Sequence, residues 1–200
     1  MNRPRFSAVI LAGGLSTRMK QLKPLLPLGK TTALNHVIDT FTQSKVDVLL
    51  VTGSRREEIE AGVINRSITI IYNPDYEKGM FTSVKAGIRG IKPEYRAFFI
   101  LPVDIPLVTT ETIKELIAAS MLNPHKIIYP VFNAERGHPP LIPNLLIPDI
   151  LGWEKDGGLK AVLKTYEKRA VEVVVNDKFI LFDIDTPEDY QELLDNYKHI

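Results

Sequence analysis

Cysteine is absent from this chain of 200 residues, which excludes a disulfide framework and a thiolate metal site. An excess of one charge is also lacking: 25 lysines and arginines stand against 24 aspartates and glutamates, for a net charge of +1. Such a balance gives no electrostatic reason to bind nucleic acid or a membrane over a whole face. The first apolar run, residues 8–12, is too short for a signal-peptide core or a membrane span. These absences predict a soluble cytoplasmic protein with no nucleic-acid or membrane partner.

Apolar runs alternate with helical patterns through the first part of the chain. Buried strands are predicted at residues 8–12, 46–51, 68–72 and 97–101, and helices at residues 34–41, 80–91 and from about residue 110. The strands are apolar throughout rather than at every second position, which is typical of a parallel sheet covered on both sides. The sequence therefore predicts an α/β fold: a Rossmann-like, open, mostly parallel sheet with helices on both faces.

Beyond residue 125 the predicted elements become shorter and prolines cluster. Strands are predicted at residues 171–175 and 180–184, before a final helix with an apolar stripe formed by Tyr190, Leu193, Leu194 and Tyr197. No low-complexity stretch or internal repeat separates the two parts. We therefore expect one domain over residues 1–200, in which the part from about residue 126 elaborates the same sheet.

A glycine pair directly follows the first predicted strand. Ligands of open α/β sheets bind beyond the carboxyl ends of the strands, and Gly13-Gly14 lies at such an end. Adjacent glycines let the backbone approach a triphosphate and present N–H donors to it. Arg18 and Lys23 add positive charge, Arg as a bidentate ligand and Lys as a point charge. The alternative is a plain turn followed by two solvated cations.

The segment Gly29-Lys30-Thr31-Thr32 imitates the end of a P-loop. The first glycine of that motif would fall on Pro24, and no predicted strand leads into it. Pro24 and Pro27 also lack the N–H donors that a phosphate cradle needs. We interpret this segment as a turn ahead of the helix that contains Leu34.

An aspartate, Asp104, follows the fourth predicted strand between Pro102 and Pro106. A carboxylate at this end of the sheet would stand at the mouth of a ligand cleft. Mg²⁺ takes hard oxygen ligands, typically one or two carboxylates together with substrate phosphates. The structural alternative is that Asp104 bonds to the backbone of the following turn.

A second acidic segment, residues 183–189, precedes the final helix. Thr186 as N-cap, Pro187 at the first helical position and acidic residues in the first turn explain most of it as a helix start. This explanation does not cover Asp185. Strand alternation would place Asp183 and Asp185 on the same face.

The helix predicted from residue 80 carries Ser83 near its start, and Asn73 lies upstream at the end of the third strand. A helix N-terminus attracts anions through its free N–H groups and its dipole, although capping alone also accounts for a serine there.

A loop fixed by glycine and proline contains Gly137 and His138. The histidine would donate to an acceptor phosphate or transfer a proton, and the alternative is a surface residue. Gly157-Gly158, close to Lys160, forms a second turn with a permissive backbone and a nearby cation.

The pattern L-A-G-G-x-S-x-R-M-x-x-x-K-P-L at residues 11–25 resembles the signature loop of nucleotidyltransferases with an α/β fold of the nucleotide-diphospho-sugar transferase type. The molybdenum-cofactor (molybdopterin) guanylyl- and cytidylyltransferases are the most similar group. The L-x-x-D-x-P setting of Asp104 and the D-x-D-T-P-E-D segment at residues 183–189 are similar to theirs as well. The resemblance spans nearly the whole chain, from residue 7 to about residue 195.

This resemblance implies a Mg²⁺-dependent enzyme that moves a nucleoside monophosphate from a nucleoside triphosphate to a phosphorylated acceptor, molybdopterin, with release of pyrophosphate. It implies catalytic roles for Arg18, Lys23 and Asp104, and Mg²⁺ binding by Asp104 and Asp185. Nucleotide contacts are expected from Leu11, Ala12, Gly13, Gly14, Ser16, Arg18, Lys23, Asn73 and Ser83. Acceptor contacts are expected from Gly137, His138 and Lys160. Residues 1–125 would then be the nucleotide-binding half and residues 126–200 the acceptor-binding half with the second metal ligand, and a molybdoenzyme that receives the product is an expected partner.

The nucleotide base is the point at which the motifs diverge. The segments around Ser83, His138 and Asp185 resemble the cytidylyl branch, whereas Gly13 resembles the guanylyl pattern, because the cytidylyl branch usually has alanine there. CTP is favoured over GTP on this balance. Two other functions stay open: the same chemistry with a sugar phosphate or another small phosphate as acceptor, and a carrier that binds a nucleotide or a pterin cofactor without catalysis.

Overall fold

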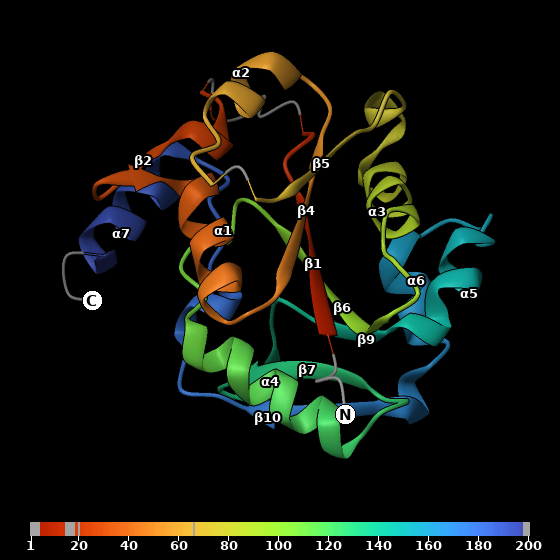
Figure 1. The fold of residues 1–200 in the computed structure, drawn as a ribbon. Coiled ribbons are helices and arrows are strands. Elements are labelled where there is room, and N and C mark those ends of the chain that lie inside the picture. The colour runs from red at the N-terminus through yellow and green to blue at the C-terminus, as the bar shows by residue number, and fades with distance from the viewer. Residues whose placement is uncertain (1–4, 15–18, 20, 66, 198–200) are drawn as a thin grey trace.

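The computed structural model describes residues 5–14, 19, 21–65 and 67–197, which form a mostly parallel sheet covered by helices on both faces (Figure 1). The described strands of the main sheet lie in the order β5-β4-β1-β6-β9-β7-β10, and β8 pairs with β7. Their bounds are Arg5–Leu11 (β1), Asp47–Thr52 (β4), Thr69–Tyr72 (β5), Tyr95–Pro102 (β6), Ile127–Phe132 (β7), Glu135–Arg136 (β8), Leu141–Pro143 (β9) and Ala170–Val174 (β10). The predicted α/β fold class is confirmed.

Strand β1 lies in the middle of the parallel part of this sheet. It pairs in parallel with β4 on one side and with β6 on the other, and β5 extends the sheet beyond β4. Beyond β6, the short strand β9 runs antiparallel to both β6 and β7, while β10 is parallel to β7. Because β1, β4 and β6 point the same way, their carboxyl ends meet at one edge of the sheet.

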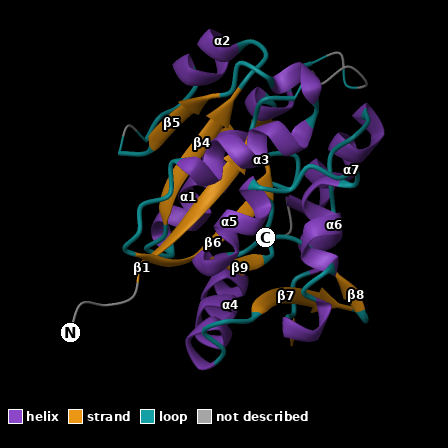
Figure 2. Cartoon of the chain, turned by 90° about the vertical axis from the view of Figure 1, so that its right-hand side faces the viewer, coloured by secondary structure: helices purple, strands orange, loops and turns teal. Residues whose placement is uncertain are grey.

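Alternating side chains of β1 enter two different cores, which explains why the strand is apolar at every position from Ala8 to Leu11. Ala8 and Ile10 pack in a core with α1 and α4, whereas Val9 and Leu11 pack in a core with α3, α5 and α6. Figure 2, viewed from the side of α3, α5 and α6, shows these helices in front of the strands. The described helices are Ala33–Gln43 (α1), Arg56–Ala61 (α2), Met80–Arg89 (α3), Thr110–Leu122 (α4), Ile147–Leu151 (α5), Gly158–Lys164 (α6) and Pro187–Tyr197 (α7).

A two-stranded hairpin outside the main sheet supports the C-terminal helix. It consists of Pro27–Leu28 (β2) and Thr31–Thr32 (β3), and Leu28 shares a core with Leu193 of α7. The Tyr190 hydroxyl donates to the carbonyl of Pro27 at 2.6 Å. In the segment that imitates a P-loop, Gly29 and Lys30 form the turn of this hairpin, with Gly29 at φ +60°, and Thr31–Thr32 form β3. The predicted turn ahead of the helix that contains Leu34 is confirmed.

The strand predicted at residues 180–184 is wrong. A 3-10 helix covers Lys178–Leu181, and the residues from 182 to 186 have no regular structure. Asp177 begins this turn, because its carboxylate accepts a hydrogen bond from the Phe179 N–H at 3.0 Å. The apolar side chains that suggested a strand enter different cores, Phe179 in the one under α7 and Ile180 in the one under α1. Apolar neighbours can therefore be buried here without a sheet partner.

The other predicted strands and helices are confirmed to within a few residues at their ends. The structure adds elements that the sequence pattern did not reveal, chiefly β7, β9, α5 and α6 in the second part of the chain. Within the described residues, no helix is long and apolar enough to cross a membrane.

Candidate active site

Asp104 lies just beyond the carboxyl end of β6, next to the end of β1. The Val103 N–H donates to the Leu11 carbonyl at 3.1 Å and thereby continues the pairing of the two strands to their ends. The carboxyl group of Asp104 is mostly enclosed, with 22% of its side chain exposed. The strand end thus delivers this carboxylate to the edge of the sheet at which ligands bind in such folds.

Asp185 is brought to the same place by two backbone contacts. The N–H of Ile184 donates to the carbonyl of Asp104 at 2.8 Å, so the segment before α7 is bound directly to the loop after β6. The Asp189 carboxylate accepts from the N–H groups of Asp185 and Thr186 at 2.9 and 2.7 Å, and the Thr186 hydroxyl accepts from the Asp189 N–H at 3.2 Å. This reciprocal cap confirms the predicted helix start and also fixes the backbone of Asp185.

The ammonium group of Lys23 lies between the two carboxylates. Its Nζ atom is 2.7 Å from Asp185 Oδ1 and 3.3 Å from Asp104 Oδ2, and only 12% of its side chain is exposed. Lys23 begins a short 3-10 helix, Lys23–Leu25, that precedes the β2–β3 hairpin. Asp104 and Asp185, which follow Lys23 in the chain by 81 and 162 positions, therefore meet at the Lys23 ammonium group.

The electrostatics of Asp104 suit a ligand for a hard cation. Burial raises the pKa of Asp104 above its ordinary value, and the charge of Lys23 opposes this rise. Asp104 Oδ1 is buried and has no hydrogen-bond partner within the described residues. An oxygen of this kind gains from a cation, because an unsatisfied buried polar atom carries a free-energy cost of about 1–3 kcal/mol.

The set of donors around Asp104 distinguishes between kinds of metal. In the part of the chain that the structure describes, no cluster of three or more histidines, cysteines, aspartates or glutamates could hold an ion. Two carboxylates alone do not complete a zinc site, which takes at least three protein ligands. They match Mg²⁺, which is commonly held by one or two carboxylates and by phosphate oxygens of the substrate. The residues present therefore fit Mg²⁺ bound together with a nucleotide.

Lys23, Asp104 and Asp185 line a cavity of about 350 Å³, which we call the Asp104 cavity. It is also lined by Leu11, Ala12, Gly13, Gly14 and Ser83. The segment that contains Gly13 and Gly14, which we call the glycine loop, packs closely here. A Cβ on Gly13 would lie 3.3 Å from the Gly53 nitrogen and 3.4 Å from the Ser83 hydroxyl. Two further predicted nucleotide ligands, Ser16 and Arg18, lie outside the described residues.

Asn73 has a different position from the other predicted nucleotide ligands. It is buried, and its amide donates at 2.9 Å to the hydroxyls of Ser83 and Thr82. Its amide oxygen accepts the N–H of Asp75 at 3.0 Å. Asn73 is not among the residues that line the Asp104 cavity, whereas Ser83 is. The structure thus places Asn73 behind Ser83, at the start of α3.

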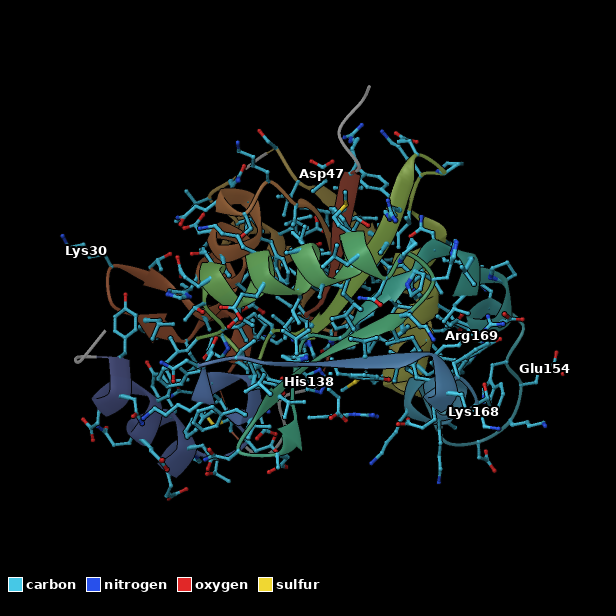
Figure 3. The ribbon with its side chains drawn as sticks, turned by 90° about the horizontal axis from the view of Figure 1, so that it is seen from below. Lys30, Asp47, His138, Glu154, Lys168 and Arg169 are labelled. Atoms are coloured by element: carbon cyan, nitrogen blue, oxygen red, sulfur yellow. The ribbon has the colours of Figure 1, made fainter. Side chains whose placement is uncertain are left out.

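A second, larger cavity of about 740 Å³ adjoins the first, and we call it the His138 cavity. The predicted acceptor ligands Gly137, His138 and Lys160 all line it. Leu11, Met80 and Pro102 line both cavities, so the two meet at the carboxyl ends of β1 and β6. In Figure 3, His138 lies in the middle of the molecule, far from Lys30 at its edge.

The loop that carries His138 is held tightly. The His138 N–H donates to the Ile180 carbonyl at 2.8 Å, and a Cβ on Gly137 would lie only 2.5 Å from that same oxygen. The His138 side chain is accessible from the cavity, yet the atoms around it lower its pKa by desolvation, which the charges of Asp104 and Asp183 partly oppose. Desolvation at this position thus favours the uncharged imidazole over the imidazolium.

Several residues of the two cavities escaped the sequence analysis. Tyr76, Glu77 and Met80 line the Asp104 cavity, and Phe81 and Tyr129 line the His138 cavity. The sequence carries a signal for Met80, because it is a large apolar residue in the first turn of a predicted helix. In the structure Met80 is 62% exposed. Tyr129 carried none, since its strand was not predicted.

A charged cavity next to Gly13 and Gly14 meets a cavity lined by Phe81 and Tyr129, an arrangement that can hold two ligands side by side. A family model, the MobA-like NTP transferase domain, matches residues 8–171, and the chain belongs to this family of nucleotidyltransferases. The resemblance read from the motifs is confirmed.

Known proteins agree with this assignment over the length of the chain. The molybdenum cofactor cytidylyltransferase of Escherichia coli K12 is 33% identical over 193 residues, which are 96% of this chain and 97% of the relative. A homologue of Mycobacterium tuberculosis Rv0371c, from Mycobacterium sp. strain JC1, has the same fold, with a TM-score of 0.87, 24% identity and 99% of each chain covered. Rv0371c itself, solved in complex with manganese, has a TM-score of 0.77 at 21% identity, over 97% of this chain and 100% of that one.

Proposed function

We propose that this enzyme transfers cytidine monophosphate from CTP to the terminal phosphate of molybdopterin, with Mg²⁺ as cofactor and pyrophosphate as the second product. One observation carries the proposal: Lys23 joins Asp104 and Asp185 in a cavity that the glycine loop lines and that opens into the His138 cavity. We propose CTP rather than GTP as the substrate because a relative that matches nearly the whole chain is a cytidylyltransferase.

In this proposal the two cavities divide the substrates. The triphosphate lies in the Asp104 cavity against Leu11, Ala12, Gly13, Gly14 and Ser83, with Ser16 and Arg18 from the same loop. Asn73 contributes by positioning Ser83. The acceptor lies in the His138 cavity against Gly137, His138 and Lys160. The volume of this cavity is ample for a small molecule. Residues 1–125 thus hold the nucleotide, and residues 126–200 supply the acceptor site and Asp185, within one domain.

The reaction is an in-line displacement at the α-phosphorus of CTP. A phosphate oxygen of the acceptor forms the new P–O bond while the bond between the α-phosphorus and the bridging oxygen breaks, and pyrophosphate leaves with that oxygen. The acceptor phosphate is already ionised at pH 7, so no general base is required. Arg18 and Lys23 neutralise the charge that develops on the leaving pyrophosphate. His138 donates a hydrogen bond to the acceptor phosphate.

Asp104 and Asp185 are the proposed metal ligands, with the buried Asp104 Oδ1 as the donor that has no other partner within the described residues. Bound Mg²⁺ would supply charge neutralisation at the phosphates, which typically accelerates phosphoryl transfer. The manganese complex of Rv0371c supports a divalent metal in a protein of this fold. We further propose that the enzyme acts in the cytoplasm and passes its product to a molybdoenzyme.

Pyrophosphate release tests the function directly. We expect release from CTP when molybdopterin and Mg²⁺ are both present, less from GTP, and little when either the acceptor or the metal is omitted. Release with a sugar phosphate in place of molybdopterin would replace the proposed acceptor but leave the chemistry intact. Binding of nucleotide without pyrophosphate release under any of these conditions would overturn the proposal in favour of a carrier.

A further inference from the structure

The ammonium group of Lys23 lies between the carboxylates of Asp104 and Asp185, the two proposed metal ligands. Its Nζ atom is 2.7 Å from Asp185 Oδ1 and 3.3 Å from Asp104 Oδ2. The three side chains are mostly enclosed, with exposed fractions of 12%, 22% and 30% for Lys23, Asp104 and Asp185. Two carboxylates this close repel each other, so the pair requires a cation.

We propose that Lys23 is an exchangeable counter-cation, which holds Asp104 and Asp185 together in the nucleotide-free protein and gives up this place when a divalent metal enters with the nucleotide. This inference rests on the proposed function, because it takes the two carboxylates as the metal ligands. The proposal gives Lys23 a second role: it binds the two carboxylates before it contacts the triphosphate.

The exchange follows from the charges in the Asp104 cavity. An ammonium group and a divalent cation that share the same two carboxylates repel each other at short distance, and this repulsion grows as water is excluded. Lysine has a flexible stem of four carbons, so its ammonium group can move without a change of backbone. Lys23 lines the same cavity as Gly13 and Gly14, and a triphosphate bound there offers the displaced ammonium group a new anionic partner.

The order of binding is the consequence of this exchange. A metal ion alone must displace Lys23 without offering it another anion, whereas a metal ion that arrives with the triphosphate provides one. The nucleotide-free protein should therefore bind metal weakly, and Lys23 should be the cause. If Lys23 served only as a phosphate ligand, its removal would leave the metal affinity of the nucleotide-free protein unchanged.

Mn²⁺ titration of nucleotide-free protein, followed by the electron paramagnetic resonance signal of free Mn²⁺, measures this effect. We expect Lys23→Met to tighten Mn²⁺ binding by at least about thirtyfold, the bulk-water value for removing one unit charge about 4 Å from a divalent cation. Lys23→Arg keeps the charge and should not tighten binding. Lys114→Met is the control for net charge, since Lys114 is 59% exposed, pairs with Glu111 and lines neither cavity.

A second measurement keeps the test decisive if Lys23→Met folds poorly. Lys23→Met removes the ammonium group that lies between the two carboxylates, so Mn²⁺ should raise the Tm of Lys23→Met more than that of the wild type. Equal Mn²⁺ affinity and equal Tm shifts in wild type and Lys23→Met would overturn the exchange. Asp104→Asn separates this failure from that of the proposed function: if it leaves Mn²⁺ binding unchanged in both backgrounds, the metal ligands themselves are wrong.

Discussion

Gly137 lies in close contact with the 3-10 helix at Lys178–Leu181. Its backbone N–H donates to the Pro130 carbonyl at 2.9 Å, and the position of a Cβ would be 2.6 Å from the Ile180 side chain and 2.5 Å from its carbonyl oxygen. The sequence analysis interpreted Gly137 as an acceptor contact. The structure shows that it also lets the loop that carries His138 lie against the 3-10 helix at Lys178–Leu181.

Gly137→Ala should destabilise the protein by about 1–3 kcal/mol, the usual cost of forcing extra atoms into a packed region. Because the loop must move, the KM for the acceptor should rise more than the KM for CTP. Urea unfolding and steady-state kinetics measure the two effects. Gly14→Ala is the control for stability, since a Cβ there meets no atom of the described residues within 4 Å. A Gly137→Ala variant as stable as the wild type would show that the close approach is not required.

Helix α7 shows how one element positions a residue of the site. The reciprocal cap between Thr186 and Asp189 sets the start of the helix, and the same Asp189 carboxylate accepts the backbone N–H of Asp185. Tyr190 and Leu193 anchor the helix on the β2–β3 hairpin, which follows Lys23 in the chain. The elements that carry Lys23 and Asp185 are thereby packed against each other.

Thr186→Ala should remove about 1 kcal/mol of stability, the typical loss for an N-cap, and should also lower kcat by releasing the backbone next to Asp185. Thr32→Ala is a matched control, because the Thr32 hydroxyl caps α1 by accepting the Asn35 N–H at 3.3 Å but does not adjoin a carboxylate of the site. It should lose similar stability with kcat unchanged. Equal kcat values for both variants at full folding would contradict a positioning role for the α7 cap.

The central elements could be predicted because their sequence pattern has one physical cause. Strand β1 is apolar at every position from Ala8 to Leu11 because neighbouring residues such as Val9 and Ile10 enter opposite cores. Helix α1 shows its apolar stripe because only one of its faces is buried. The second part of the chain lacks such a pattern. Strand β9 has only three residues, too few for a detectable strand pattern. Strand β7 contains Pro130, a residue that argues against a strand in a sequence.

At the scale of the whole molecule, the site is assembled from the carboxyl ends of parallel strands. Their shared direction made the convergence of the glycine loop with Asp104 predictable from sequence alone. The meeting of the two cavities was not predictable, because it depends on the antiparallel strand β9, which lies between β6 and β7 and sets the distance from Asp104 to the wall that contains Tyr129. Pairing across a sheet between distant segments leaves no local pattern in a single sequence.

The proposal that Asp104 and Asp185 hold one metal ion and act together is tested most directly by the rate of pyrophosphate release from CTP and molybdopterin in the two single variants and the double variant. Asp104→Asn and Asp185→Asn should each lower kcat by about 10²–10³, the typical loss for one electrostatic contact in a transition state. Because both carboxylates serve one cation, the double variant should lose little more than the worse single variant. Wild-type rates in either single variant, or losses that multiply in the double variant, would show that the two aspartates do not act together.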